Sequence, residues 1–216
     1  MDGESGRRAK ATGFVDRADA GRRLVRELPP LDDPLVLGLP RGGVAVAAAV
    51  AKELAAPLDV IVVRKLGLPV QPELAMGALA SGGVRVLNRE VLDHARVPPA
   101  VLEQVTRHEA AELAARERLY RGERPFPRLA GRDVVVVDDG LATGATMRAA
   151  VEACREQDPR RVLAAVPVAP RETAEAFRRQ GIELVAALVP EPFGAVGAWY
   201  RDFAATTDEE VVALLR

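Results

Sequence analysis

The chain has 216 residues, of which 49% are hydrophobic, and its formal net charge at pH 7 is −1. This size allows one sizeable core, and the near-neutral charge gives no basic field to attract nucleic acid. The longest apolar run, Val44 to Ala51, is too short to cross a bilayer, and we expect no signal peptide. The single cysteine, Cys154, excludes an internal disulfide. We therefore expect a cytoplasmic protein, with neither a membrane nor a nucleic acid as partner.

The first part of the chain predicts a helix and then alternating strands and helices. Residues 1–12 are polar and basic, and we expect them to form a disordered arm. A helix then begins after Asp16, which can cap it, and ends before Pro29 and Pro30. The alternation that follows is typical of a parallel βαβ unit. Its members are a buried strand over 34–39, a glycine turn over 40–43, a helix to about residue 55, and a strand over 58–63 that ends in Arg64 and Lys65.

The middle of the chain interrupts this alternation. Residues 66–83 are rich in Gly and Pro, and we expect a mobile segment ahead of a short strand over 84–87. Residues 88–122 predict a helical insertion broken at Pro98 and Pro99; either this insertion or the preceding segment could supply a lid or hood. Alternation then resumes with a strand over 134–137, a helix over 145–155, a strand over 161–168, a helix over 172–180 and a strand over 182–188.

The expected architecture is therefore an open α/β fold, in which a mainly parallel sheet carries helices on both faces. Residues 13–190 would form this core, and residues 191–216 a small hood or tail. The tail holds four aromatic residues of a chain that has only five Phe, two Tyr and one Trp. These rings either pin the tail onto the core or form a wall that stacks on a base. In the last helix, Thr207 and Glu210 predict a capping box.

The stretch Val134 to Thr146, VVVVDDGLATGAT, is the most informative in the chain. Four valines predict a strand buried on both faces, and Asp138 and Asp139 follow at the sheet edge where open α/β folds bind ligands. The loop that comes next offers backbone N–H groups, hydroxyls and a helix N-terminus, which suit a phosphate. It consists of Ala142, Thr143, Gly144, Ala145 and Thr146.

Carboxylates for a sugar diol beside a phosphate cradle indicate a phosphorylated ribose. The plainer interpretation is an acidic turn before a capped helix, which any α/β protein can contain. A nucleoside-triphosphate P-loop would require a lysine after the glycine, whereas Ala145 follows Gly144 here.

This stretch resembles the signature of the type I phosphoribosyltransferases, except that Gly140 stands where an aliphatic residue or Ser is more usual. The resemblance implies that the protein binds 5-phosphoribosyl 1-pyrophosphate (PRPP) with Mg²⁺ as cofactor. Asp138 and Asp139 would then hold the ribose hydroxyls and contact the metal mostly through water. The loop over residues 142–146 would bind the 5′-phosphate.

A second group of residues, Arg41, Gly42 and Gly43, lies between a predicted strand and a helix N-terminus. Glycines let backbone N–H groups approach an anion, and the helix end favours negative charge. In the resembled family this loop binds pyrophosphate, often with a cis peptide, for which the Pro40–Arg41 bond is the candidate. Arg64 and Lys65 are expected at the same sheet edge, where a cation stabilises the departing pyrophosphate. Lys65, one of three lysines in the chain, is the preferred charge partner.

The acceptor is less defined. In purine-salvage members of the family a C-terminal aromatic ring stacks on the base, and the stretch PFGAVGAWYRDF resembles that region. On this resemblance Phe193 is the stacking candidate, and Val196 offers backbone contacts. The expected reaction transfers phosphoribosyl to a nitrogen nucleophile, a nucleobase or similar small molecule, and releases pyrophosphate. The alternative is a regulator that senses PRPP with weak or no turnover. Dimers are common in the family, so a homodimer is among the expected states.

Overall fold

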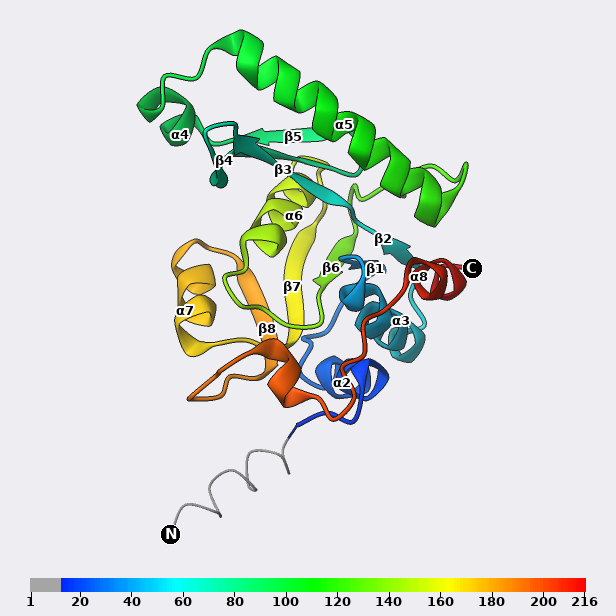
Figure 1. The fold of residues 1–216 in the computed structure, drawn as a ribbon. Helices are drawn as coiled ribbons and strands as arrows, with labels where there is room; N and C mark the ends of the chain where they lie inside the picture. The colour runs from blue at the N-terminus through cyan, green and yellow to red at the C-terminus, as the bar shows by residue number, and fades with distance from the viewer. Residues whose placement is uncertain (1–12) are drawn as a thin grey trace.

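A parallel five-stranded sheet forms the centre of the computed structural model, which describes residues 13–216 (Figure 1). The arm expected over 1–12 lies outside the described residues. The strand order is β2-β1-β6-β7-β8, so the chain runs first to one side of the sheet and then to the other. The strands are β1 (Pro34–Gly38), β2 (Leu58–Val60), β6 (Asp133–Val137), β7 (Arg161–Val168) and β8 (Glu183–Leu188).

Helices cover both faces of this sheet, and the valines of β6 explain why. Val134 and Val136 pack in the core under α6 and α7, whereas Val135 and Val137 pack against α2 and α3. Side chains alternate along a strand, so a strand with a helix layer on each face needs apolar residues at every position. The helices are α2 (Arg17–Val25), α3 (Gly42–Leu54), α6 (Ala145–Arg155) and α7 (Arg171–Arg179). The predicted open α/β fold is thus confirmed.

A second, antiparallel sheet is present where the sequence predicted the end of a parallel strand and a mobile segment. It consists of β3 (Val63–Leu68), β4 (Gln71–Ala80) and β5 (Val84–Leu87), in that order. The strand predicted over 58–63 ends at Val60, and Arg64 and Lys65 lie inside β3 rather than at the end of a parallel strand. The segment expected to be mobile forms most of a hairpin, in which Leu66, Leu68 and Met76 are buried in one cluster. Gly82 and Gly83, both with positive φ, make the turn that follows.

The helical insertion packs onto this antiparallel sheet. It forms α4 (Arg89–His94) and α5 (Pro99–Arg121), with the predicted break at Pro98 and Pro99 confirmed. Leu113 of α5 lies in one buried cluster with Leu66 and Met76 of the sheet. At the end of α5, the buried Arg121 donates to the backbone oxygen of Val60 at 3.4 Å and to the Ser81 hydroxyl at 3.3 Å. This arginine therefore ties the insertion to the point where the two sheets meet.

The C-terminal segment returns across the molecule to the N-terminal one. It contains the 3₁₀ helix η1 (Val196–Trp199) and α8 (Asp208–Leu214), whose predicted capping box is present. The Phe14 N–H donates to the Trp199 carbonyl at 2.7 Å, and the Arg201 N–H donates to the Phe14 carbonyl at 2.9 Å. The rings of Phe14 and Tyr200 lie 5.3 Å apart. The aromatic residues of the tail thus pin it to the core, as one of the two interpretations expected.

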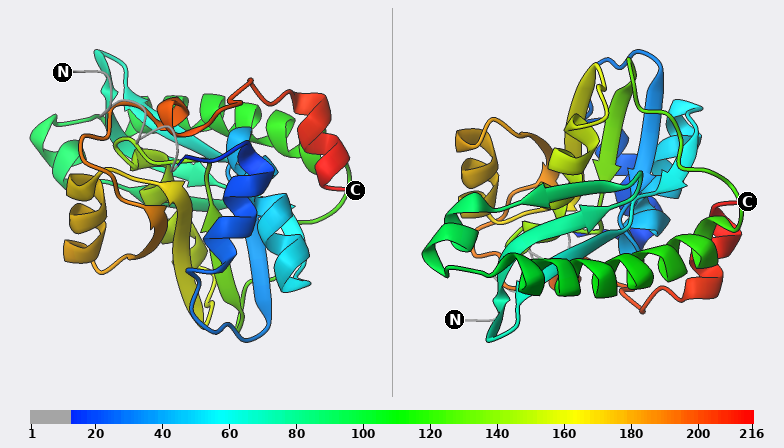
Figure 2. Two further views of the ribbon diagram at one scale, coloured as in Figure 1. Left: turned by 90° about the horizontal axis from the view of Figure 1, so that it is seen from below. Right: turned by 90° about the horizontal axis from the view of Figure 1, so that it is seen from above.

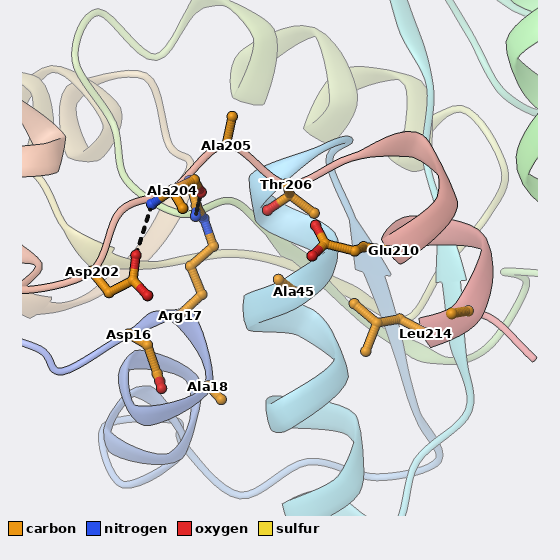
Figure 3. Close-up of a pocket in the computed structure, with 11 residues that line it drawn as sticks. Asp16, Arg17, Ala18, Ala45, Asp202, Ala204, Ala205, Thr206, Glu210 and Leu214 are labelled. Carbon is orange, nitrogen blue, oxygen red and sulfur yellow. Dashed lines mark hydrogen bonds between the residues drawn. The ribbon is translucent and has the colours of Figure 1, made fainter.

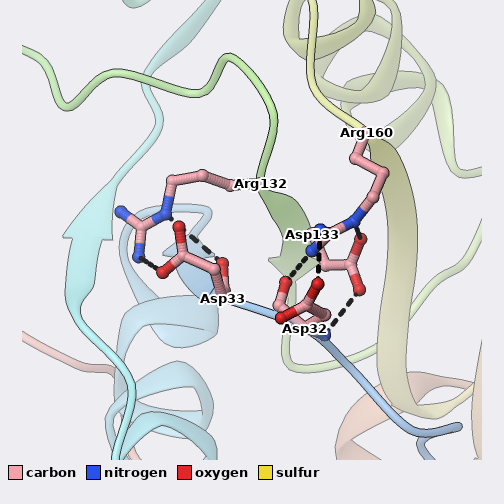
Figure 4. Close-up of polar contacts among 5 residues, drawn as sticks. All are labelled: Asp32, Asp33, Arg132, Asp133 and Arg160. Atoms are coloured by element: carbon pink, nitrogen blue, oxygen red, sulfur yellow. Dashed lines mark hydrogen bonds and ion pairs between the residues drawn. The ribbon is translucent and has the colours of Figure 1, made fainter.

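The two edges of the parallel sheet differ in chemistry. At the amino edge, Arg160 binds Asp133 at 2.9 Å and also pairs with Asp32, while Arg132 pairs with Asp33 (Figure 4). Arg160 and Asp133 also join the starts of two neighbouring strands. The β3–β4 hairpin and the C-terminal segment lie at the opposite, carboxyl edge (Figure 2). That edge is where ligands bind in open parallel sheets.

Candidate functional site

Asp138 and Asp139 follow β6 directly and lie at the carboxyl edge of the sheet. The Asp139 N–H donates to Asp138 Oδ1 at 2.9 Å, which fixes the turn between the two acids. Burial, together with the charge of the neighbouring Asp139, raises the pKa of Asp138 to about 7. A carboxyl whose pKa is raised strongly by burial and by a neighbouring carboxylate is a common mark of a functional site.

Asp139 is held from two directions. Both Nε and Nη2 of Arg17, in the first turn of α2, lie against Asp139 Oδ2, at 2.9 and 2.8 Å. The Tyr200 hydroxyl donates to the Asp139 carbonyl at 2.5 Å. No motif in the sequence identified Arg17 or Tyr200, because both come from segments far from the acid pair in the chain. Only the folded contacts show that they belong to this site.

The glycine loop lies against the acid pair, as the sequence predicted. A Cβ placed on Gly42 would come within 2.0 Å of Asp139 Oδ2, and one on Gly43 within 2.8 Å of the Asp138 Cα. Only glycine permits this approach at the two positions. The peptide bond between Pro40 and Arg41 is cis, as the family resemblance implied. Arg41 itself is exposed at the start of α3.

Most residues of the predicted phosphate loop are exposed, and hydrogen bonds to its carbonyl oxygens hold the loop in place. Gly144 adopts the left-handed conformation, with φ of 74°, and α6 begins at the next residue. The Thr173 hydroxyl donates to the Ala142 carbonyl at 2.7 Å, and Arg148 donates to the Thr143 carbonyl at 2.6 Å. These bonds engage carbonyl oxygens, which leaves the N–H groups of the first turn of α6 directed outward, where an anion can accept from them.

Lys65 and Arg64 are separated, although the sequence predicted that both would face one ligand. Arg64 Nε donates to Glu109 of α5 at 2.8 Å. Lys65 is exposed and, with Thr146, lines a cleft of about 750 Å³ between the antiparallel sheet and α6. Because β3 is an edge strand, Lys65 also borders a groove between this strand and α5. The two side chains separate because both residues lie within β3, and neighbouring side chains of a strand point to opposite faces. Lys65 alone of the two shares a cleft with the phosphate loop.

Of the tail residues, Val196 lies next to the acid turn, and both Phe193 and Val196 are partly buried. A Cβ on Gly140 would come within 2.5 Å of Val196 Cγ1, so the missing side chain at this position lets the tail approach the turn. The Trp199 indole donates to the Phe193 carbonyl at 2.9 Å. Both Phe193 and Val196 belong to the cluster around Phe14. Their predicted contacts with a base stay predictions.

Comparisons with known proteins identify the family of the chain. The family model described as phosphoribosyl transferase domain matches residues 23–184. The Mycobacterium tuberculosis protein Rv0571c, which bears the provisional name phosphoribosyl transferase, is 49% identical over 205 residues; these are 94% of this chain but 46% of that protein. The crystal structure of TT1426 from Thermus thermophilus has a TM-score of 0.86 and 47% identity, and the match covers 94% of this chain and 97% of that one. The chain therefore belongs to the phosphoribosyl transferase domain family, a family of pentosyltransferase domains.

Proposed function

We propose that the protein is a phosphoribosyltransferase that uses PRPP and Mg²⁺. It would transfer the phosphoribosyl group to a nitrogen nucleophile, a nucleobase or a similar small molecule, and release pyrophosphate. The observation that carries this proposal is the close approach of Gly42 to Asp139, because it joins the expected pyrophosphate loop to the expected ribose-binding acids. Membership of the phosphoribosyl transferase domain family over residues 23–184 supports the reaction class.

Three groups of residues would divide the work. The N–H groups of the loop over 142–146 and the N-terminus of α6 would hold the 5′-phosphate. The Asp138 and Asp139 carboxylates would accept hydrogen bonds from the ribose hydroxyls. Arg41 and the N–H groups of Gly42 and Gly43 would hold the pyrophosphate. The rate enhancement would come mainly from position and charge, since the reaction needs no covalent intermediate on the protein.

In the reaction, the bond between ribose C1 and the pyrophosphate oxygen breaks, and its electron pair leaves on that oxygen. The lone pair of the nucleophilic nitrogen forms the new bond to C1, and the nitrogen then releases its proton. Negative charge grows on the leaving oxygen, so a cation near it stabilises the transition state more than the ground state. Lys65 is the preferred cation, because it lines the cleft that the phosphate loop also borders.

The acid pair also fits Mg²⁺. Hard carboxylate oxygens are the donors this ion prefers, and it keeps several waters when substrate phosphates supply other ligands. Within residues 13–216 no group of three or more His, Cys, Asp or Glu side chains could hold a metal by itself. Asp138 and Asp139 would therefore contact the ion mostly through water, and the bound ion would supply positive charge against the pyrophosphate oxygens.

The acceptor, the other partners and the cellular location are proposed as well. The acceptor would lie near Gly140, with Phe193 stacking on it and Val196 offering backbone contacts. In the part of the chain that the structure describes, no helix is both long and apolar enough for a transmembrane span. We propose a cytoplasmic protein with small-molecule substrates and no nucleic acid partner; the homodimer stays a prediction.

Calorimetric titration with PRPP and Mg²⁺ tests the proposal. The double variant Asp138→Asn, Asp139→Asn should lose PRPP binding and keep its fold, because both amides remain close in shape to the carboxyls. Asp93→Asn, an exposed position on α4, is the matched control and should bind as the wild type does. An unchanged affinity in the double variant would contradict the proposed site.

A further inference from the structure

Arg17 binds a carboxylate, a backbone carbonyl and an aromatic ring at the same time. Its Nε and Nη2 reach Asp139 Oδ2, and its Nη1 donates to the Ala204 carbonyl at 2.7 Å. The guanidinium also lies over the Phe203 ring, 4.1 Å from its centroid. The side chain is 12% exposed, and the Asp139 side chain is 18% exposed. One arginine thus joins three separate segments: α2, the acid turn and the C-terminal segment.

The contact is confined on its remaining side by Gly42. A Cβ at this position would lie 2.0 Å from Asp139 Oδ2 and 2.9 Å from Arg17 Nε. The glycine loop, the acid turn and Arg17 therefore meet at one point. Any shift of the Arg17 side chain would alter how Asp139 sits against the loop expected to hold pyrophosphate.

We infer that Arg17 is a positioning residue that holds the Asp139 carboxylate against the glycine loop and couples it to residues 199–204 of the C-terminal segment. Arg17 does not need to touch substrate for this role. Its planar fork is required for the coupling to the C-terminal segment, because a lysine has a single charged group and cannot bind Asp139, bond the Ala204 carbonyl and stack on Phe203 together. The inference rests on the proposed function only where it concerns PRPP.

The surroundings of Arg17 fit this role. It forms part of the wall of a pocket of about 430 Å³ between α2, α3 and the C-terminal segment (Figure 3). The carboxylates at this pocket already accept backbone hydrogen bonds: Asp16 from Asp19, Asp202 from Ala204, and Glu210 from Thr207. Arg17 pairs instead with Asp139, and its bond to the Ala204 carbonyl ties the C-terminal segment to the same point.

Two measurements on the full chain test the inference, with Arg17→Gln, Arg17→Lys and Arg22→Gln. Arg22 is the control, since it is an exposed arginine of the same helix whose contact with Asp19 is a long 3.7 Å. The first measurement is calorimetric affinity for PRPP with Mg²⁺. The second is hydrogen exchange at the Arg201 and Asp202 amides, which donate to Phe14 and Val15. The second needs no ligand, so it reports on the coupling even if PRPP does not bind.

We expect Arg17→Gln to weaken PRPP affinity about tenfold and to speed exchange at both amides by a similar factor. Arg17→Lys should recover most of the affinity, within about threefold of the wild type, but not the protection of the amides, because the lysine keeps the charge and loses the fork. Arg22→Gln should leave both unchanged. Wild-type affinity in Arg17→Gln, or unchanged exchange at the two amides, would overturn the inference. Absence of PRPP binding in the wild type with faster exchange in Arg17→Gln would reject the proposed function and retain the coupling.

Discussion

Arg64 and Lys65 are neighbours in the chain, yet β3 directs them to opposite faces of the antiparallel sheet. Arg64 pairs with Glu109 of α5, and both its Nε and its Nη2 lie 2.8 Å from the carboxylate. Lys65 lines the cleft that Thr146 also borders. The two cations therefore have different tasks: Arg64 fastens α5 to the sheet, and Lys65 is available to an anionic ligand.

Substituting these two residues should separate the tasks. Lys65→Met should lower kcat/KM for PRPP at least tenfold with little change in the free energy of unfolding, because it removes a charge near the leaving group. Arg64→Met should cost about 1 kcal/mol of stability or less, the usual range for a partly exposed ion pair. Turnover assays and urea unfolding of both variants measure the difference. Equal effects of the two substitutions on kcat/KM would contradict the assignment.

The parallel core was predictable because its signals are local. The valine run of β6, the cap at Asp16 and the turn before α6 each depend on a few adjacent residues, and all three were correct. Of the antiparallel sheet only β5 was predicted, since β3 and β4 lie mostly in a segment whose Gly and Pro content indicated a loop. That error also placed Arg64 wrongly, because the face on which a side chain lies changes at every residue.

In the candidate site, too, the features carried by adjacent residues were predicted and those that depend on distant contacts were not. The acids and the two loops were identified because each is a compact motif, and the fold brings them together. Arg17 and Tyr200 were missed because they reach Asp139 from opposite ends of the chain. Contacts between distant segments depend on the tertiary fold, which residue spacing does not encode.

Stability should depend on pH through Asp138. Burial and the charge of Asp139 raise its pKa from 3.8 to about 7 in the folded protein. The folded state keeps this proton to a higher pH than the unfolded state, so the contribution to stability is full below about pH 4 and is lost as pH rises through about 7. Asp138→Asn should therefore be more stable than the wild type at pH 8, by on the order of 4 kcal/mol, since the shift spans roughly three pKa units and each is worth about 1.4 kcal/mol.

Urea unfolding of Asp138→Asn and wild type at pH 5 and pH 8 measures this difference. The gap between the two proteins should narrow toward pH 5. A gap that is the same at both pH values would show that the carboxyl titrates in its ordinary range.

Asp133 should give the opposite dependence. Burial alone would raise its pKa, but the hydrogen bond from the Asp32 N–H and the Arg160 guanidinium hold the pKa below its usual range. Its contribution to stability is therefore present above about pH 4 and is lost as pH falls through the folded-state pKa. Asp133→Asn should be less stable than the wild type at pH 7, and the two should converge near pH 2. Thermal unfolding across this range checks it; parallel curves would be contrary evidence.

The Gly42 contact predicts a loss of binding from one methyl group. Gly42→Ala should weaken PRPP binding at least tenfold, because its Cβ would displace the Asp139 carboxylate. Gly83→Ala is the control: it has φ of 77° and no atom within 4 Å of the new Cβ. That variant should lose about 1 kcal/mol of stability through backbone strain and bind normally. Calorimetry and urea unfolding of both proteins measure these effects, and normal binding in Gly42→Ala would be inconsistent with the site.

The most direct test of the account is pyrophosphate release from PRPP and Mg²⁺, measured across a panel of nucleobases and without any base. We predict release that requires an acceptor and that falls to background in the Asp138→Asn, Asp139→Asn double variant. Tight PRPP binding without release for any acceptor would identify a sensor. Release at the same rate without an acceptor would identify a hydrolase, and either result would contradict the proposed transferase.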